Sequence, residues 1–468
     1  MTNSEIEFIF QSQKANKFVI GQTVFEERKR KLIAMKDYLL AHLDTACEAT
    51  AVDLQKPKSE TLISEIFVLI NEINYTVKHL KKWMKPARQV SGLAAIGTSN
   101  HIYYESKGQV LIISPWNYPI NLALKPLISA VAAGCVAILK PSELTPASSS
   151  FLSKMIETIF PSTEVKVVEG NVEVAQKLLE QPFDHIFFTG STAVGKIVMK
   201  AASKNLTSVT LELGGKSPCI IDASCDLEST ARLIAWGKFF NAGQTCIAPD
   251  YVLIERSIQP QFMELLGRVI SKMYDPEGKG VQASSSLARI INGSHFDRLV
   301  GYLQDAENKG AQILIGGQYQ SELKFIAPTV IDQVKDDMLL MREEIFGPIL
   351  PIIPFADLSE AIDYVNARDK PLALYIHSKH QDNIERVLRE TSSGNALVNE
   401  VLSHFGNPDL PFGGVNQSGI GKSNGFYGFV EFSNPKGVMK RRFGTIKFLF
   451  PPYGPKLEMW LRRALKWM

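Results

Sequence analysis

The feature that most constrains this 468-residue chain is a series of short apolar segments separated by helix-length stretches. The apolar segments show little alternation, so both faces of each are expected to be buried, as in a parallel sheet covered by helices on both sides. The predicted strands are 109–114, 135–140, 165–168, 185–189 and 208–213. This order predicts an α/β fold with a doubly wound parallel sheet of the nucleotide-binding kind.

A second alternating region, from about residue 214 to residue 401, predicts another α/β domain. Its candidate strands are 251–255, 312–315, 349–355, 372–377 and 396–399. Before residue 85 the pattern is helical, because apolar residues recur at three- and four-residue steps. These residues are Phe67, Ile70, Ile73, Val77 and Leu80. The stretch 85–106 interrupts the helical pattern with prolines and glycines, and we expect a hairpin there.

Charge and cysteine content exclude several classes of protein. The formal net charge of +3 is too small for this length to indicate a nucleic acid partner. The number of cysteines is odd and no CxxC pair occurs, which argues against a disulfide framework and against a zinc site, so no metal is expected. The start carries Glu5 and Glu7 rather than a signal peptide, and no apolar run reaches the roughly 18 residues of a membrane-spanning helix. We therefore expect a cytoplasmic protein.

Two segments have the composition of a reactive centre. Cys246 follows Gly243 and small polar residues, which leaves its sulfur open to close approach by a substrate. Glu212 ends an apolar strand and is followed by Gly214 and Gly215, at the position where open α/β sheets bind ligands. Neither segment is decisive alone, since a single cysteine is more often buried packing and a strand-end glutamate is more often solvated or ion-paired.

Seven motifs in a fixed order extend along nearly the whole chain. They are ISPWNYP at 113–119, KPSE at 140–143, FTGSTAVG at 188–195, ELGGKSP at 212–218, GQTC at 243–246, EEIFGP at 343–348 and PFGG at 411–414. This series resembles the aldehyde dehydrogenase superfamily. The short amino-terminal region and the stretches 235–238 and 448–452 are most similar to its class 3 branch. Members of that branch oxidise medium-chain, aromatic and fatty aldehydes, so the resemblance implies a hydrophobic aldehyde substrate and at least a homodimer.

The resemblance also assigns catalytic roles. Cys246 is implied to be the nucleophile, whose thiolate attacks the aldehyde carbon, so the site should lower the pKa of this thiol or supply a base. Asn117 and the backbone N–H of Cys246 are implied to donate to the developing oxyanion; outside this series Asn117 would be interpreted as a turn residue. After hydride transfer, Glu212 is implied to be the general base that activates water to hydrolyse the thioester.

The expected cofactor is NAD or NADP. Gly190, Ser191 and Gly195 span a strand-to-helix turn, whose helix N-terminus suits a pyrophosphate, although such a spacing alone is also ordinary turn chemistry. In the family, the residues that match Glu344 and Phe346 hold the nicotinamide ribose and the nicotinamide ring.

Lys140 and Glu143 match family residues beside the adenosine ribose. A glutamate near the ribose hydroxyls favours NAD, because it accepts hydrogen bonds and repels a 2′-phosphate, whereas the lysine favours NADP. The preference between the two cofactors therefore stays open, and a surface ion pair is the alternative interpretation of both residues.

The predicted architecture has four parts. They are an NAD(P)-binding domain from 1–84 and 107–213, a catalytic domain from 214–424, a bridging or oligomerisation β element from 85–106 and 425–450, and an amphipathic tail from 451–468. By resemblance, the bridging element pairs with a neighbouring subunit.

The pattern of residues 456–468 predicts a short basic amphipathic helix with a net charge of +3. Its apolar face consists of Leu457, Trp460, Leu461, Ala464, Trp467 and Met468. At 13 residues the helix is too short to span a membrane. Two interpretations stay open: peripheral contact with a membrane surface, or packing on the partner subunit or the substrate entrance.

Four residues are candidates for the wall of the substrate pocket. Trp236 either lines an aromatic substrate channel or packs in the core, since large aromatic side chains are usually buried in any case. Tyr118, His404 and Phe405 are the remaining candidates, and they come from distant segments of the chain.

Two rival functions are compatible with the same fold. In the first, coenzyme A rather than water cleaves the thioester, but Glu212 argues against this, because a thiolytic enzyme needs no such base. In the second, the chain is a catalytically idle structural or membrane-associated relative. This is disfavoured, because the nucleophile, base and oxyanion donor are all present.

Overall fold

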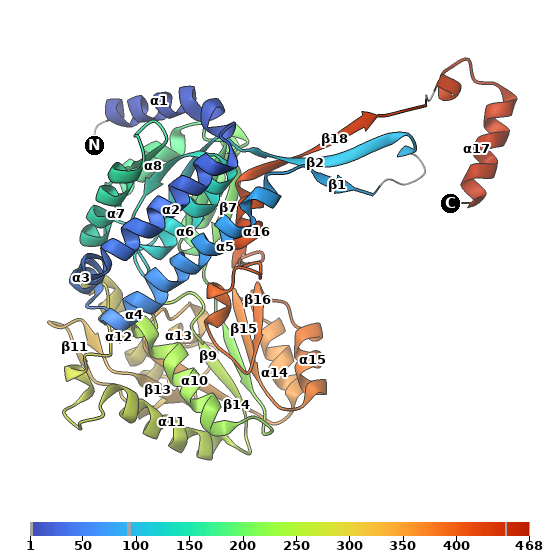
Figure 1. Ribbon diagram of the computed structural model, residues 1–468. Coiled ribbons are helices and arrows are strands. Elements are labelled where there is room, and N and C mark those ends of the chain that lie inside the picture. Colours follow the sequence, from blue (N-terminus) through green and yellow to red (C-terminus); the bar gives the residue numbers. More distant parts are fainter. Residues whose placement is uncertain (1–2, 91–94, 445–446, 468) are drawn as a thin grey trace.

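The computed structural model describes residues 3–90, 95–444 and 447–467. Two central sheets, each flanked by helices, form the body, and a narrow arm leaves it at one side (Figure 1). The predicted α/β class is confirmed, with a doubly wound parallel sheet, a second α/β region and a small antiparallel sheet. Among the helices of the described residues, none combines the length and apolar character needed to cross a membrane.

The first sheet has six strands in the order β17-β7-β6-β3-β4-β5. Its members are β3 (Gln109–Ile113), β4 (Val136–Lys140), β5 (Val165–Val167), β6 (His185–Thr189), β7 (Ser208–Glu212) and the short β17 (Gly419–Ile420). All pairs are parallel except β17 with β7. The chain runs outward from β3 through β4 to β5 and then returns to the other side of β3 with β6 and β7. The strand order therefore reverses between β3 and β6, which is where such sheets bind ligands.

Helices cover both faces of this sheet. One face packs against α1 (Asn3–Gly21), α8 (Val172–Glu180) and α9 (Thr192–Ala202). The other packs against α2 (Phe25–Ala41), α5 (Val68–Trp83), α6 (Asn121–Ala133), α7 (Pro146–Ile159) and α16 (Gly425–Glu431). Within β3, Val110 and Ile112 belong to one core and Leu111 to the other, which explains why residues 110–113 are all apolar.

The segment between α2 and α5 passes close to the second half of the body (Figure 1). It consists of α3 (Leu43–Leu54), α4 (Lys58–Thr61) and a π-helix (Leu62–Phe67) that continues into α5. A π-helical turn is rare, and such turns frequently occur at functional sites.

The second sheet has seven strands in the order β10-β13-β14-β9-β8-β15-β16. They are β8 (Pro218–Ile221), β9 (Tyr251–Glu255), β10 (Gln312–Ile315), β13 (Thr329–Asp332), β14 (Ile349–Phe355), β15 (Ala373–His377) and β16 (Asn395–Val398). Its helices are α10 (Leu227–Phe239), α11 (Gln259–Tyr274), α12 (Gly293–Asn308), α13 (Leu339–Arg342), α14 (Leu358–Asn366) and α15 (Gln381–Glu390). The pattern did not predict β8 and β13, because each contains or adjoins a proline.

A three-stranded antiparallel sheet forms the arm. Its strands are β1 (Ala87–Gln89), β2 (Thr98–Ser106) and β18 (Ser433–Arg441), in the order β1-β2-β18. The predicted hairpin is present as β1 and β2, and its connecting residues 91–94 lie outside the described residues. Beyond the arm, α17 (Pro455–Trp467) is the predicted tail helix and stands away from the body (Figure 1).

Candidate active site

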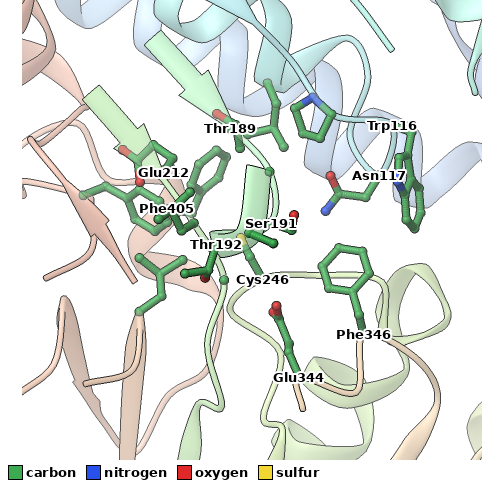
Figure 2. A pocket seen from close by; sticks show the side chains of 18 of the residues that line it. Trp116, Asn117, Thr189, Ser191, Thr192, Glu212, Cys246, Glu344, Phe346 and Phe405 are labelled. Carbon is green, nitrogen blue, oxygen red and sulfur yellow. The ribbon is translucent and has the colours of Figure 1, made fainter. Parts of the chain in front are cut away.

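A cavity of about 500 Å³ opens at the carboxyl ends of β3, β6 and β7, at the point where the strand order reverses. Segments of the second half close it from the opposite side (Figure 2). The predicted site residues in its wall are Asn117, Gly190, Ser191, Glu212, Cys246, Glu344 and Phe346. Motifs from distant parts of the chain therefore meet in one space.

Cys246 lies on a loop with an unusual backbone. After α10, Asn241 and Ala242 both have positive φ, at 53° and 52°. Gly243 has a φ of 74°, and a Cβ there would lie 2.2 Å from the carbonyl oxygen of Gly347, so the turn requires glycine. The turn carries Cys246 into the cavity wall, where the residue is partly exposed.

The thiol of Cys246 is not activated by its surroundings alone. Burial raises its pKa, and the negative charges of Glu344 and Glu212 raise it further. The direction of this shift favours the second of the two predicted routes to a thiolate, a base that accepts the thiol proton.

Asn117 follows β3 and is nearly completely buried. Its side-chain Nδ2 donates to the backbone oxygen of Gln244, at 3.0 Å, two residues before Cys246. An amide nitrogen has two N–H groups, so one remains available to a substrate oxygen. In the next residue, the hydroxyl of Tyr118 lies 2.5 Å from Oγ1 of Thr245, which adds a second link between the two segments.

Glu212 is the last residue of β7, and its carboxylate is almost fully buried. Ser423 donates to Oε1 at 3.0 Å, whereas Oε2 has no hydrogen-bond partner within the described residues. Burial raises the pKa of this carboxyl to about 7, and the Ser423 hydroxyl and nearby lysines oppose that rise. A carboxyl with a pKa near neutrality is suited to take and release a proton at physiological pH.

Glu344 and Phe346 enter the cavity from the loop before β14. Burial raises the pKa of Glu344 to about 8, and the charge of Asp250 contributes to the rise. Its Oε1 is a buried oxygen without a partner among the described residues. A Cβ on Gly214 would lie 2.0 Å from Oε2 of Glu344, so this carboxylate lies directly against the glycine backbone. Phe346 packs edge-on against Trp116, with ring centroids 5.4 Å apart.

The turn after β6 leads into α9. Ser191 is the N-cap of that helix, and its hydroxyl accepts from the backbone N–H of Val194 at 3.4 Å. Gly195 does not line the cavity; a Cβ there would lie 2.6 Å from Leu213, so it allows α9 to pack closely on the end of β7.

Lys140 and Glu143 lie outside the lining of this cavity. Lys140 is buried, and its Nζ donates to Glu143 at 2.9 Å and to the backbone oxygen of Pro141 at 3.0 Å. Partial burial raises the pKa of Glu143, but hydrogen bonds from the backbone and from Lys140 outweigh it and bring the pKa below its usual value. The two residues therefore form an ion pair after β4, at the same edge of the sheet as the cavity.

A second cavity of about 620 Å³ reaches Cys246 from the other side. Its wall includes Tyr118, Trp236 and Phe405, so Trp236 lies in a pocket wall and is half-buried. His404 is not part of this wall; it is buried, and burial lowers its pKa to about 3. Cys246 is thus shared by two cavities.

Sequence reasoning missed several polar residues that line the first cavity: Lys125, His295, Arg298, Tyr302 and Ser423. Lys125 lines the first cavity from α6; its Nζ donates to the backbone oxygen of Phe405 at 2.6 Å, and burial lowers its pKa to about 8. A single lysine in an otherwise apolar helix was a usable signal, because an unpaired buried lysine is rare. Ser423, the partner of Glu212, gave no signal, since it is 211 residues away in the sequence.

Comparison with known proteins gives a consistent result. The profile of the aldehyde dehydrogenase family matches residues 1–438. Bacillus subtilis AldX is 46% identical over 434 residues, which cover 93% of this chain and 97% of that protein. Aldehyde dehydrogenase family 3 member B1 of Rattus norvegicus, a class 3 enzyme, is 42% identical over 440 residues, covering 93% and 92%.

Solved structures agree with these relatives. The substrate-bound state of Staphylococcus aureus AldH superposes with a TM-score of 0.93 at 39% identity, and covers 98% of this chain and 99% of that one. An NAD-dependent aldehyde dehydrogenase from Sinorhizobium meliloti has a TM-score of 0.87 at 28% identity, covering 97% and 89%. This chain therefore belongs to the aldehyde dehydrogenase family, with class 3 enzymes among its relatives.

Proposed function

We propose that this enzyme oxidises a hydrophobic aldehyde to the carboxylic acid with NAD or NADP, through a thioester on Cys246. The observation that carries this proposal is the position of Cys246 in the walls of two cavities at once. Glu212, Glu343 and Glu344 line the first cavity, which adjoins the N-terminus of α9. Aromatic side chains, among them Trp236 and Phe240, line the second. A cofactor in the first and an aldehyde in the second would meet at the sulfur.

The first cavity fits a dinucleotide in three respects. The N-terminus of α9 and the glycine turn before it suit a pyrophosphate. The unpartnered buried oxygen of Glu344 suits a ribose hydroxyl, and Phe346 offers a flat apolar surface for a ring. Lys140 and Glu143 would lie by the adenosine ribose at the same sheet edge. When bound, NAD or NADP supplies the hydride acceptor.

The first half of the reaction would proceed on Cys246. A base takes the thiol proton, the sulfur bonds to the aldehyde carbon, and the carbonyl electron pair moves to the oxygen. The free N–H of Asn117 and the backbone N–H of Cys246 would donate to that oxyanion. Loss of hydride from the same carbon then restores the C=O bond and leaves a thioester.

The second half would depend on Glu212. Its carboxylate takes a proton from water, the hydroxide oxygen adds to the thioester carbon, and the carbon–sulfur bond breaks. The carboxylic acid is released and the thiolate returns. A pKa of about 7 leaves a large fraction of this carboxyl ionised at neutral pH, as the role requires.

The composition of the second cavity supports a hydrophobic aldehyde. Its apolar wall residues include Ile63, Phe67, Tyr118, Trp236, Phe240 and Phe405. Burying a side chain-sized apolar group in such a space contributes about 1.5–3 kcal/mol to binding. Small polar aldehydes would gain little from this wall.

The decisive test measures NAD(P)H absorbance with aldehydes from acetaldehyde to hexadecanal and with benzaldehyde, for the wild type and for Cys246→Ala. We expect cofactor reduction that is lost in the variant. Equal activity in both proteins would remove Cys246 as the nucleophile. Adding coenzyme A distinguishes the alternative acceptor, because formation of acyl-coenzyme A would replace the hydrolytic step.

The arm and the tail favour an assembly larger than one chain, and we propose at least a homodimer. In the described part of the chain, β18 and β1 are edge strands of the arm sheet. The tail helix exposes Trp460, Leu461 and Leu465 beside basic residues. This surface fits two kinds of contact: with a partner subunit, or with the anionic cytoplasmic surface of a membrane. Light scattering tests for the dimer, and sedimentation with anionic vesicles tests for membrane binding.

A further inference from the structure

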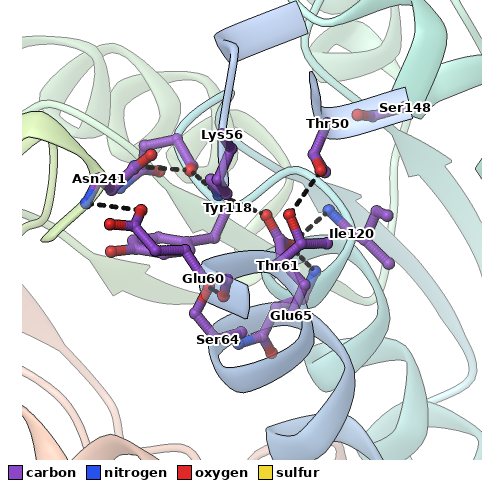
Figure 3. Close-up of polar contacts among 12 residues, drawn as sticks. Thr50, Lys56, Glu60, Thr61, Ser64, Glu65, Tyr118, Ile120, Ser148 and Asn241 are labelled. Atoms are coloured by element: carbon purple, nitrogen blue, oxygen red, sulfur yellow. Dashed lines mark hydrogen bonds and ion pairs between the residues drawn. The ribbon is translucent and has the colours of Figure 1, made fainter. Parts of the chain in front are cut away.

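A buried ion pair lies directly behind the turn that carries Asn117. The side chains of Lys56 and Glu65 are both fully buried, with Nζ and Oε1 2.7 Å apart. Lys56 also donates to the backbone oxygen of Asn117 at 2.9 Å, and its Nζ lies 4.3 Å from the centre of the Tyr118 ring (Figure 3). One ammonium group is therefore bound to a carboxylate and to the oxyanion segment at the same time.

Glu65 lies on the π-helix and holds the other end of the same turn. Its Oε2 accepts from the backbone N–H groups of Ile120, at 3.1 Å, and of Asn121, at 2.8 Å, where α6 begins (Figure 3). Asn121 in turn donates from Nδ2 to the backbone oxygen of Ser64 at 2.6 Å. The residues on either side of Pro119 are thus bound to one short segment of the amino-terminal region.

The same segment also reaches the loop of the nucleophile. Glu60 accepts from the backbone N–H of Asn241 at 3.0 Å, which supports a residue with positive φ. Asn241 donates from Nδ2 to the backbone oxygen of Asn117 at 2.9 Å and to that of Gln244 at 3.2 Å. Lys56 and Asn241 therefore both donate to the backbone oxygen of Asn117. This oxygen links the amino-terminal segment to the loop that carries Cys246.

We propose that Lys56 and Glu65 are positioning residues that fix the Asn117 amide where the oxyanion forms. This inference rests on the proposed function, in which Asn117 stabilises that oxyanion. The free N–H of Asn117 is directed by two constraints: its side chain is bound to Gln244, and its backbone oxygen is bound to Lys56 and Asn241. Without Lys56 the backbone constraint rests on Asn241 alone.

A purely structural role makes a different prediction. Breaking any buried ion pair leaves an uncompensated charge and destabilises a protein. Lys31 and Glu164 form such a pair, with Nζ and Oε1 2.7 Å apart and both side chains almost buried, but neither residue lines either cavity. Lys31→Met is therefore a matched control for the loss of a buried lysine.

The test is a double-mutant cycle on single-turnover NADH formation, which reports thiohemiacetal formation and hydride transfer before hydrolysis. We expect Asn117→Ala to slow this step about 100- to 1,000-fold, and Lys56→Met to slow it about 10- to 100-fold. Because both act through one amide, the double variant should be within about 2-fold of Asn117→Ala alone. The Kd for the cofactor should not change, and Lys31→Met should keep the wild-type rate.

Multiplied losses in the double variant would overturn the inference, because they would show that Lys56 acts apart from Asn117. Glu65→Gln, which keeps the shape of the side chain, provides a second variant if Lys56→Met folds poorly. It too should slow the reaction in the wild-type background but not in the Asn117→Ala background. If the wild type itself reduces no cofactor, the proposed function fails. A crystal structure of Lys56→Met then decides the positional claim, which is refuted if the Asn117 amide stays bound to Gln244.

Discussion

Replacing Glu212 by glutamine should stabilise the protein above pH 7 while it removes most of the activity. Burial raises the pKa of this carboxyl from 4.5 to about 7. Between these values the folded chain keeps a proton that the unfolded chain has lost, so this group makes stability fall as the pH rises through the window. The shift corresponds to about 3 kcal/mol of destabilisation at pH 8, and to little at pH 5.

Glutamine has no charge to bury, and its oxygen can still accept from Ser423 in place of Oε1. Urea denaturation gives the free energy of unfolding of the wild type and of Glu212→Gln at pH 5 and at pH 8. The effect is the change that the substitution causes at pH 8 minus the change that it causes at pH 5. The variant should gain up to about 3 kcal/mol at pH 8 relative to its change at pH 5. The exposed control Glu322→Gln should show no such pH dependence.

The activity of the same variant tests the catalytic half of the argument. Loss of a general base typically lowers a rate by about 100- to 10,000-fold. Glu212→Gln should therefore give a burst of about one reduced cofactor per active site, followed by slow turnover as the thioester persists. Wild-type turnover would refute the role of Glu212, and an equal stability change at both pH values would refute its raised pKa.

Three further changes test other parts of the site. Gly243→Ala should destabilise the protein by more than about 2 kcal/mol in urea, because the residue has positive φ and its Cβ would meet the backbone of Gly347. Glu344→Gln should speed alkylation of Cys246 by iodoacetamide at pH 8, because removing the charge of Glu344 lowers the thiol pKa. Trp236→Ala should raise KM for hexadecanal more than KM for acetaldehyde, because Trp236 lines the apolar cavity.

Each of these changes has a control. Gly278→Ala also replaces a glycine with positive φ, but no atom lies within 4 Å of its Cβ, so it should cost less than Gly243→Ala. Cys246→Ala shows which alkylation belongs to the nucleophile, and an unchanged rate in Glu344→Gln would contradict the electrostatic argument. Equal KM changes for both aldehydes in Trp236→Ala would mean that Trp236 supports the fold rather than the chain of the substrate.

The sequence predicted the fold well where strands are buried on both faces. The central residues of β3, β4 and β6 are apolar because cores lie on both sides of these strands, and their predicted limits agree within one residue. The limits of β9 agree as well. β8 and β13 are four residues long, like the predicted β10 and β16, but each contains or adjoins a proline, which argues against a strand. Their place in the sheet depends on pairing, of β8 with β9 and of β13 with β14. A helix separates the two strands of each pair along the chain.

Motifs also predicted the residues of the first cavity, but not the groups that tune them. Cys246, Glu212 and Asn117 were recognisable because each belongs to a series that resembles a family. Lys56 and Ser423 stand outside that series, and nothing in their local sequence indicates a partner 61 or 211 residues away. Such contacts exist only once two sheets and an amino-terminal segment have packed together.

The two carboxyl groups of the cavity illustrate what packing adds to a motif. Burial raises the pKa of both, but the Ser423 hydroxyl and the charges of Lys422 and Lys125 limit the rise at Glu212 to about 7. The charge of Asp250 instead helps to raise the pKa of Glu344 to about 8. The charges around Glu212 therefore favour its ionised form more than the charges around Glu344 do, and a general base acts in its ionised form. This difference between the two neighbourhoods favours Glu212 over Glu344 as the base that activates water for hydrolysis of the thioester.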